Sequence, residues 1–258
     1  MLRPRIIPCL LIKDNGLVKS VQFKDHKYVG DPLNAVKIFN EKEVDELIVV
    51  DIDATTYDRE PDYKLIEALA TECRMPLCYG GGVKTVDQAQ RIFALGVEKV
   101  SISSEAVENL NLLREISDRV GSQSIVVVLD VKKTKRGKYE IWTHNATKNT
   151  GKDPFDFAKE LERIGIGEIV INSIDADGMM KGYDMELIDK MRNVISLPMT
   201  VLGGAGTLKD IGNLIAKYKV IGAAAGSLFV FKGIFKAVLI NYPKTTEKEV
   251  LISGNFSV

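Results

Sequence analysis

One aspartate stands within an otherwise apolar run, where a role in surface solubility does not explain it. The run Val126-Val-Val-Leu-Asp130-Val131 predicts a buried strand, because a continuous series of aliphatic residues is typical of strands covered on both faces. Burial raises the pKa of a carboxyl group toward the range in which it can exchange protons. Asp130 is therefore the first candidate for a general acid or base.

Two pairs of small-residue motifs could bind phosphate. Gly80-Gly-Gly82 precedes Ser103-Ser104, and Gly203-Gly204 precedes Gly226-Ser227 at the same spacing. Glycines let backbone N–H groups approach an anion closely, although one such motif by itself more often only makes a tight turn. The recurrence of the pair favours two phosphate sites, and hence a long ligand with phosphate at both ends.

The elements that must position these residues alternate between short apolar runs and amphipathic helical patterns. Asp31-Pro32 and Asp153-Pro154 mark two helix starts, since each places a capping carboxylate before a proline suited to the first turn. Eight such units in 258 residues predict an α/β fold, the (βα)8 TIM barrel, whereas a doubly wound sheet would leave two units unplaced. The expected strands are 6–12, 47–51, 77–80, 100–103, 124–130, 168–173, 199–203 and 220–224, and the expected helices include 32–40, 63–71, 86–95, 109–119, 154–164, 185–192 and 208–216.

An internal repeat strengthens the prediction of a barrel. Asp51-Ile-Asp53 recurs 124 residues later as Asp175-Ala-Asp177, and the glycine motif at residue 80 recurs 123 residues later at residue 203. Self-similarity at a nearly fixed offset indicates duplication. We therefore interpret the chain as one barrel domain built from two half-barrels, approximately 1–122 and 123–258.

The repeat also reveals an asymmetry between the halves. Aligning Ile125-Val-Val-Val-Leu-Asp130 on Ile6-Ile-Pro-Cys-Leu-Leu11 places Asp130 on Leu11. Two carboxylates on opposite sides of a barrel mouth could act as acid and base. With Leu11 in one half, a single carboxylate remains for both tasks.

Composition bounds the remaining possibilities. Lys plus Arg and Asp plus Glu both total 35, so the chain has no net positive charge for nucleic acid. The three cysteines Cys9, Cys73 and Cys78 form no metal-binding spacing and favour a reducing compartment. The N-terminus lacks the features of a signal peptide, and no apolar run approaches the roughly 20 residues of a membrane span. We expect a cytoplasmic protein with no metal, no nucleic-acid partner and no membrane association.

A set of short motifs is spread nearly end to end along the chain. They are Arg5-Ile-Ile-Pro-Cys-Leu10, Gly30-Asp-Pro32, Gly80-Gly-Gly82, Lys99-Val-Ser-Ile102, Lys148-Asn-Thr-Gly151, Asp177-Gly178, Gly182-Tyr-Asp184 and Gly203-Gly-Ala-Gly206. With these motifs the chain resembles the cyclase subunit of imidazole glycerol phosphate synthase, the HisF family. That family takes ammonia from a HisH-type glutaminase and passes it through the barrel. It closes an imidazole ring on a bis-phosphorylated ribulosyl aminoimidazole substrate, releasing imidazole glycerol phosphate and an aminoimidazole carboxamide ribotide in histidine biosynthesis. The resemblance implies no organic cofactor.

The resemblance assigns roles to individual residues. Asp130 matches one of two catalytic aspartates, and Lys19 with residues 21–30 matches a mobile segment that closes over substrate. One phosphate site corresponds to Gly82, Ser103 and Ser104, and the other to Asp177, Gly178, Gly204, Gly226 and Ser227. A ring of charges that gates ammonia entry corresponds to Arg5, Glu46, Lys99 and Glu168, although charges near strand starts also form purely structural ion pairs.

The departures from the family pattern affect the chemistry. Leu11 replaces the other catalytic aspartate, and Ser103, Asn172, Leu202 and Met179 replace an asparagine, a threonine, a serine and a further threonine.

Three functions remain open after these departures. The chain could be the histidine-pathway cyclase, or a paralogue that channels ammonia for amidation of a surface-polysaccharide sugar with cyclase activity weak or lost. It could also be a non-catalytic activator of the glutaminase. Leu11 argues against the first function, and Asp130 with the phosphate loops argues against the third.

Overall fold

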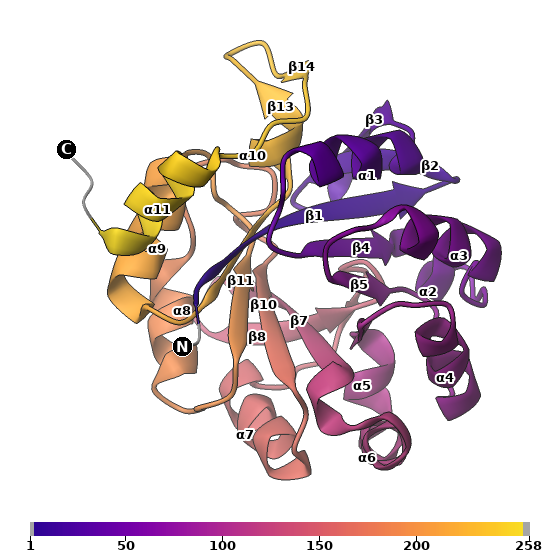
Figure 1. Ribbon diagram of the computed structural model, residues 1–258. Coiled ribbons are helices and arrows are strands. Elements are labelled where there is room, and N and C mark those ends of the chain that lie inside the picture. The colour runs from indigo at the N-terminus through magenta and orange to yellow at the C-terminus, as the bar shows by residue number, and fades with distance from the viewer. Residues whose placement is uncertain (1–2, 255–258) are drawn as a thin grey trace.

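Eight parallel strands close into a barrel, as predicted. The computed structural model describes residues 3–254. The strands follow one another around the barrel as they do along the chain, and pairing of β7 with β10 completes the ring (Figure 1). They are β1 (Arg5–Lys13), β4 (Leu47–Asp51), β5 (Leu77–Gly80), β6 (Lys99–Ile102), β7 (Ile125–Lys133), β10 (Glu168–Ser173), β11 (Met199–Leu202) and β12 (Gly222–Ala225).

Helices cover the outside of the barrel (Figure 1). Their starts follow the capping chemistry of the sequence, since the Asp31 carboxylate accepts from the Asn34 N–H and the Asp153 carboxylate accepts from the N–H groups of Phe155 and Asp156. The expected helices are present with ends shifted by at most two residues. They are α1 (Pro32–Glu41), α3 (Tyr63–Glu72), α4 (Val86–Ala94), α6 (Leu110–Val120), α7 (Pro154–Ile164), α8 (Met185–Arg192) and α9 (Leu208–Tyr218), followed by α11 (Thr245–Ser253).

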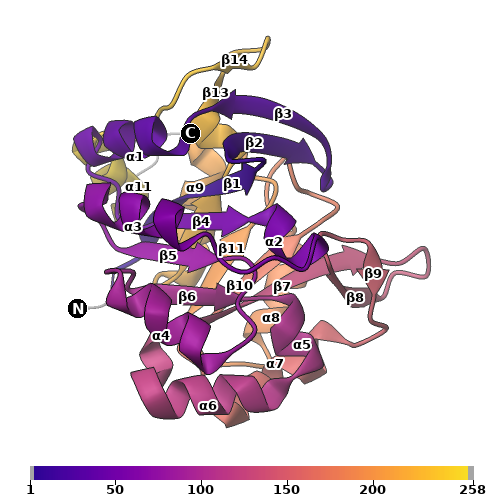
Figure 2. The ribbon, with the colours of Figure 1, turned by 90° about the vertical axis from the view of Figure 1, so that its right-hand side faces the viewer.

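Two antiparallel hairpins extend the sheet where strands end. β2 (Gly16–Val21) and β3 (Lys24–Gly30) follow β1, and β8 (Tyr139–Thr143) and β9 (Lys148–Asn149) follow β7. Figure 2 shows both at the end of the barrel toward which the parallel strands point. The segment at 21–30, matched in sequence to a mobile segment that closes over substrate, is mostly strand β3, and its backbone pairs with β2.

Shorter elements complete the fold. They are α2 (Ile52–Thr56), α5 (Ser104–Glu108), the 3-10 turn η1 (Ser122–Ser124), α10 (Ser227–Val230), and the separate hairpin of β13 (Phe231–Lys232) and β14 (Ala237–Val238). Sequence patterns miss them because elements of two to six residues carry too little periodicity. The extra hairpins follow β1 and β7, and the short helices α5 and α10 follow β6 and β12.

Two apolar layers hold the barrel together. The larger lies between the strands and the helices, and a small cluster fills the barrel interior. Side chains alternate between the two faces of each barrel strand, so every second residue points inward. The interior cluster formed by these inward residues contains Ile7, Cys9, Ile48, Cys78, Val126, Val170 and Ala224. Within residues 3–254, no helix is long and apolar enough to cross a membrane.

Candidate functional site

A cavity of about 430 Å³ opens at the carboxyl ends of the strands. Barrel enzymes carry their reactive groups at this end. The cavity brings together every residue that the sequence assigned to the mouth, and they come from both halves of the chain. They are Leu11, Lys19, Gly82, Ser103, Ser104, Asp130, Asp177, Gly178, Gly204, Gly226 and Ser227.

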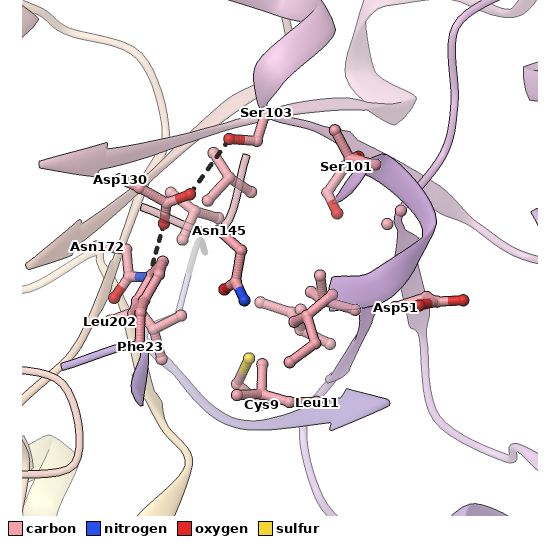
Figure 3. Close-up of a pocket in the computed structure, with 18 of the residues that line it drawn as sticks. Cys9, Leu11, Phe23, Asp51, Ser101, Ser103, Asp130, Asn145, Asn172 and Leu202 are labelled. Atoms are coloured by element: carbon pink, nitrogen blue, oxygen red, sulfur yellow. Dashed lines mark hydrogen bonds between the residues drawn. The ribbon is translucent and has the colours of Figure 1, made fainter. Parts of the chain in front are cut away.

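Asp130 is the buried carboxylate of this cavity. Its Oδ1 accepts a hydrogen bond from Asn172 Nδ2 at 2.8 Å, and its Oδ2 accepts one from Ser103 Oγ at 3.3 Å (Figure 3). Burial raises the pKa of Asp130 to about 7, and the two hydrogen bonds oppose that rise without cancelling it. A carboxyl group that titrates near neutral pH can both give and accept a proton.

Leu11 lies across the cavity from Asp130. Three strands separate β1 from β7 in either direction around the ring, so the two strands are diametrically opposed. Leu11 sits above Cys9, just as Asp130 sits above Val128, and Figure 3 shows both residues at the cavity with the space between them. The wall facing Asp130 therefore offers no second carboxylate at the corresponding position.

Ser103 and Asn172, two of the departures from the family pattern, both donate hydrogen bonds to Asp130, a contact that the sequence did not predict. Asn172 on β10 pairs in register with Asp130 on β7. Its amide nitrogen faces the carboxylate, while its buried Oδ1 has no hydrogen-bond partner within the described part of the chain. The only available signal was the order of the strands, because neighbouring parallel strands bring residues at their carboxyl ends together.

The first hairpin closes over one side of the cavity. Ser20 Oγ donates to Asp177 Oδ2 at 2.7 Å, and the Phe23 N–H donates to the same oxygen at 3.2 Å. Lys19 Nζ donates to the Cys9 carbonyl at 2.5 Å, and burial lowers its pKa. Burial shifts the pKa of Asp177 in the opposite direction, upward, because it disfavours the charged carboxylate. The sequence identified Lys19, Asp177 and, within residues 21–30, Phe23, but it missed Ser20. Ser20 and Phe23 join the hairpin to the loop that follows β10.

The two glycine-rich loops lie on opposite sides of the same cavity. β5 and β6 carry Gly82 and Ser104, and they stand opposite β11 and β12, which lead to Gly204 and Ser227. At Gly204, φ is +110° and a Cβ would lie 2.1 Å from the Gly182 carbonyl oxygen, so only glycine fits. Ser104 Oγ accepts from the His144 N–H at 3.0 Å, which ties the first loop to the second hairpin. This arrangement fits a ligand with two anionic ends.

A closed ring of charges forms the opposite end of the barrel. Arg5 contacts both carboxylates, donating to Glu46 and to Glu168 Oε1, the latter at 2.6 Å. Lys99 Nζ lies 2.8 Å from Glu46 Oε1 and 2.9 Å from Glu168 Oε2. Burial opposes ionisation of Glu168, but the charges of Arg5 and Lys99, with hydrogen bonds, outweigh it and lower the pKa of this carboxyl. The four predicted gate residues therefore meet in one alternating ring.

Above this ring, apolar side chains and two thiols line the barrel interior and the floor of the cavity. Burial raises the pKa of both the Cys9 and the Cys78 thiol, so these side chains remain neutral. Together with the aliphatic interior cluster they form a lining suited to a neutral molecule, since an ion would lose its hydration without gaining a partner. Among residues 3–254, no group of three or more His, Cys, Asp or Glu side chains is arranged to hold a metal ion.

Comparison with known proteins identifies the class. A family model described as "Histidine biosynthesis protein" matches residues 5–236, so the chain belongs to this family. It is 58% identical over 252 residues to the "Putative imidazole glycerol phosphate synthase subunit HisF" of Leptospira borgpetersenii, covering 97% of this chain and 99% of the relative. It is also 58% identical over 250 residues to the "Putative imidazole glycerol phosphate synthase subunit hisF3" of Vibrio vulnificus (strain YJ016), covering 96% of each.

A third relative has a name that does not contain the word "putative". The "Imidazole glycerol phosphate synthase subunit HisF" of Natranaerobius thermophilus is 43% identical over 242 residues, covering 94% of this chain and 96% of the relative. The chain is thus similar along nearly its whole length to HisF-type subunits of imidazole glycerol phosphate synthase. The resemblance found in its motifs is confirmed.

Proposed function

We propose that this chain is the ammonia-receiving barrel subunit of a glutamine-dependent enzyme, and that ring closure is no longer its main reaction. A HisH-type glutaminase binds at the charged ring of Arg5, Glu46, Lys99 and Glu168. Ammonia crosses the uncharged interior and leaves at the mouth for another acceptor, such as a surface-polysaccharide sugar. We also propose that the barrel arose by duplication of a half-barrel and that it uses no cofactor.

The observation that carries the proposal is that an aliphatic residue, Leu11, lies opposite Asp130 across the mouth of the barrel. Ring closure needs protons to be removed at one place and delivered at another, and two separated carboxylates would divide these tasks. Here Asp130 faces an aliphatic wall to which Leu11 and Leu202 contribute. A single positioned acid or base typically contributes about 10²–10⁴-fold to a rate, so the loss of one is a large handicap.

The interior supports the transport part of the proposal. Ammonia is small and neutral, and the cluster that fills the barrel interior above the ring is apolar. The ring forms a charged barrier at the entrance to this path. A bound glutaminase that displaces one of its ion pairs would open the entrance.

The histidine-pathway cyclase is the second candidate function. It is favoured by the two glycine-rich loops at opposite sides of the cavity and by the pKa of Asp130 near neutrality. These features fit a bis-phosphorylated substrate and one functioning acid–base group. Under this alternative, Asp130 performs both proton transfers in turn.

Turnover of the bis-phosphorylated substrate with excess ammonium separates the two candidates, because free ammonium bypasses the glutaminase. We expect wild-type turnover to lie at least about 10²-fold below that of an enzyme with both carboxylates. Leu11→Asp should raise it if the cavity still binds the substrate, and Leu11→Asn, of the same shape but without a proton to transfer, should not. Wild-type turnover of ~1 s⁻¹ or more would establish the cyclase instead.

The partner is tested separately by size-exclusion chromatography with the cognate HisH-type glutaminase. A single shifted peak of one-to-one stoichiometry is expected. Replacing Lys99 with Glu would place a like charge beside Glu46 and Glu168, so this variant should elute apart from the glutaminase. Two independent peaks with the wild-type chain would contradict the proposal.

A further inference from the structure

The hairpin of residues 231–239, here called the rim hairpin, exposes apolar side chains to an unusual degree. Ile234 and Phe235 at its tip are each 89% exposed, and Val238 and Leu239 are 45% and 49% exposed. The hairpin has two residue pairs and belongs to its own sheet, apart from the barrel. An exposed group of large apolar residues on a protein surface commonly marks an interaction site.

The rim hairpin is joined to the mouth of the barrel. It follows α10 directly, and Gly226 and Ser227 at the start of that segment line the cavity. Lys27 of β3 donates from Nζ to the Lys236 carbonyl at 3.4 Å and lies over the Phe231 ring at 5.2 Å. Figure 2 shows the rim hairpin standing out from the molecule beside β3. A protein bound to it would therefore also touch the hairpin that covers the cavity.

The charges around the apolar tip restrict what can bind there. Lys232 and Lys236 flank Ile234 and Phe235, and the sequence contains no Asp or Glu from residue 226 to residue 246. A second copy of the chain bound symmetrically through this hairpin would bring like charges together, which is unfavourable. A partner with carboxylates around an apolar groove is complementary to it.

We propose that the rim hairpin is the docking surface for the enzyme that consumes the ammonia, a protein presenting an apolar groove edged by acidic residues. This inference rests on the proposed function, in which ammonia leaves at the mouth. Ammonia released into water is diluted and protonated, so delivery requires the acceptor enzyme to sit against the mouth. Ile234 and Phe235 are the anchors, and the lysines fix the orientation and accelerate association.

The test uses the full chain with its glutaminase and a purified enzyme that aminates a surface-polysaccharide sugar, taken from the organism that encodes this chain. Phe235→Ala should weaken binding of that enzyme on the order of 30-fold, the loss usual for an interfacial aromatic anchor. Val250→Ala on α11 is the control. This helix lies toward the amino ends of the barrel strands (Figure 2), and the Val250 side chain is 45% exposed, so the substitution should leave binding unchanged. The double variant Lys232→Glu, Lys236→Glu should also weaken binding, most strongly at low salt.

A second readout separates docking from chemistry. With Phe235→Ala, glutamine-dependent formation of the aminated product should fall by about tenfold or more, while formation from free ammonium should be unchanged. Glutaminase binding at the other end of the barrel should also be unchanged. Loss of glutaminase binding by the wild-type chain would count against the proposed function rather than against this inference.

Four outcomes would overturn the inference while the glutaminase complex stays intact. The acceptor enzyme could fail to bind the wild-type complex, or could bind the wild-type and Phe235→Ala chains equally. In the other two outcomes, light scattering would detect a dimer of the wild-type chain, or the wild-type chain would bind phosphatidylglycerol vesicles, and Phe235→Ala would abolish that association. The first of these would assign the rim hairpin to a second copy of the chain, and the other to a membrane surface.

Discussion

Replacing Asp130 with Asn should make the protein more stable, and by an amount that depends on pH. The folded protein holds the proton of Asp130 with a pKa of about 7, whereas the ordinary value is 3.8. Unfolding at a pH between these values releases a proton, so the contribution of this group to stability falls as the pH rises from about 4 to 7 and is constant above that range. The difference in pKa corresponds to about 4 kcal/mol of unfolding free energy at pH 8.

The Asp130→Asn variant has no such loss, because an amide does not ionise. Its Oδ1 can accept from Asn172 Nδ2 and its Nδ2 can donate to Ser103 Oγ, so both present hydrogen bonds have a counterpart. We therefore expect the variant and the wild type to be similarly stable near pH 4. At pH 8 the variant should be more stable by roughly 4 kcal/mol.

Urea unfolding of both proteins at pH 4, 5, 6, 7 and 8 gives the required free energies. The comparison with Asp130→Asn cancels the contributions of other groups that titrate in this range. Asp118→Asn, at an exposed position on α6, is the matched control for the chemical change from aspartate to asparagine. A difference for Asp130→Asn that is constant from pH 4 to pH 8 would show that Asp130 titrates normally and that its burial has no electrostatic cost.

Two further substitutions probe the two ends of the barrel. Arg5→Ala removes one of the two cations that the buried Glu46 and Glu168 share and leaves only Lys99 in the ring to balance them, so urea unfolding should show a loss of about 3 kcal/mol. A loss below about 0.5 kcal/mol, the scale of a surface pair, would contradict the idea of a buried ring. Gly178→Ala places a Cβ 2.1 Å from the Ser20 carbonyl oxygen at a φ of +68°, so the first hairpin should detach and its amide hydrogens, at residues 22–30, should exchange faster. Unchanged protection there would show that the hairpin is not held by this contact.

Local sequence determined most of the barrel. The expected strands 47–51, 77–80 and 168–173 coincide with β4, β5 and β10, and the expected helices 154–164 and 185–192 coincide with α7 and α8. These elements were predictable because apolar periodicity and capping residues act over a few neighbouring positions. The repeat in the sequence likewise placed Leu11 and Asp130 at the same step of their strands, and both line the cavity.

Contacts between side chains that are distant in the sequence depend on closure of the barrel. Asn172 and Ser103 surround Asp130 because β10 and β6 both neighbour β7, although 42 and 27 residues separate them from it along the chain. The charged ring joins Arg5 to Glu168 across 163 residues. The rim hairpin was not predicted, since its strands are two residues long and its apolar residues resemble a buried segment. Sequence patterns record which residues prefer burial, but the pKa of a carboxyl group and the exposure of a phenylalanine depend on neighbours that closure of the barrel supplies.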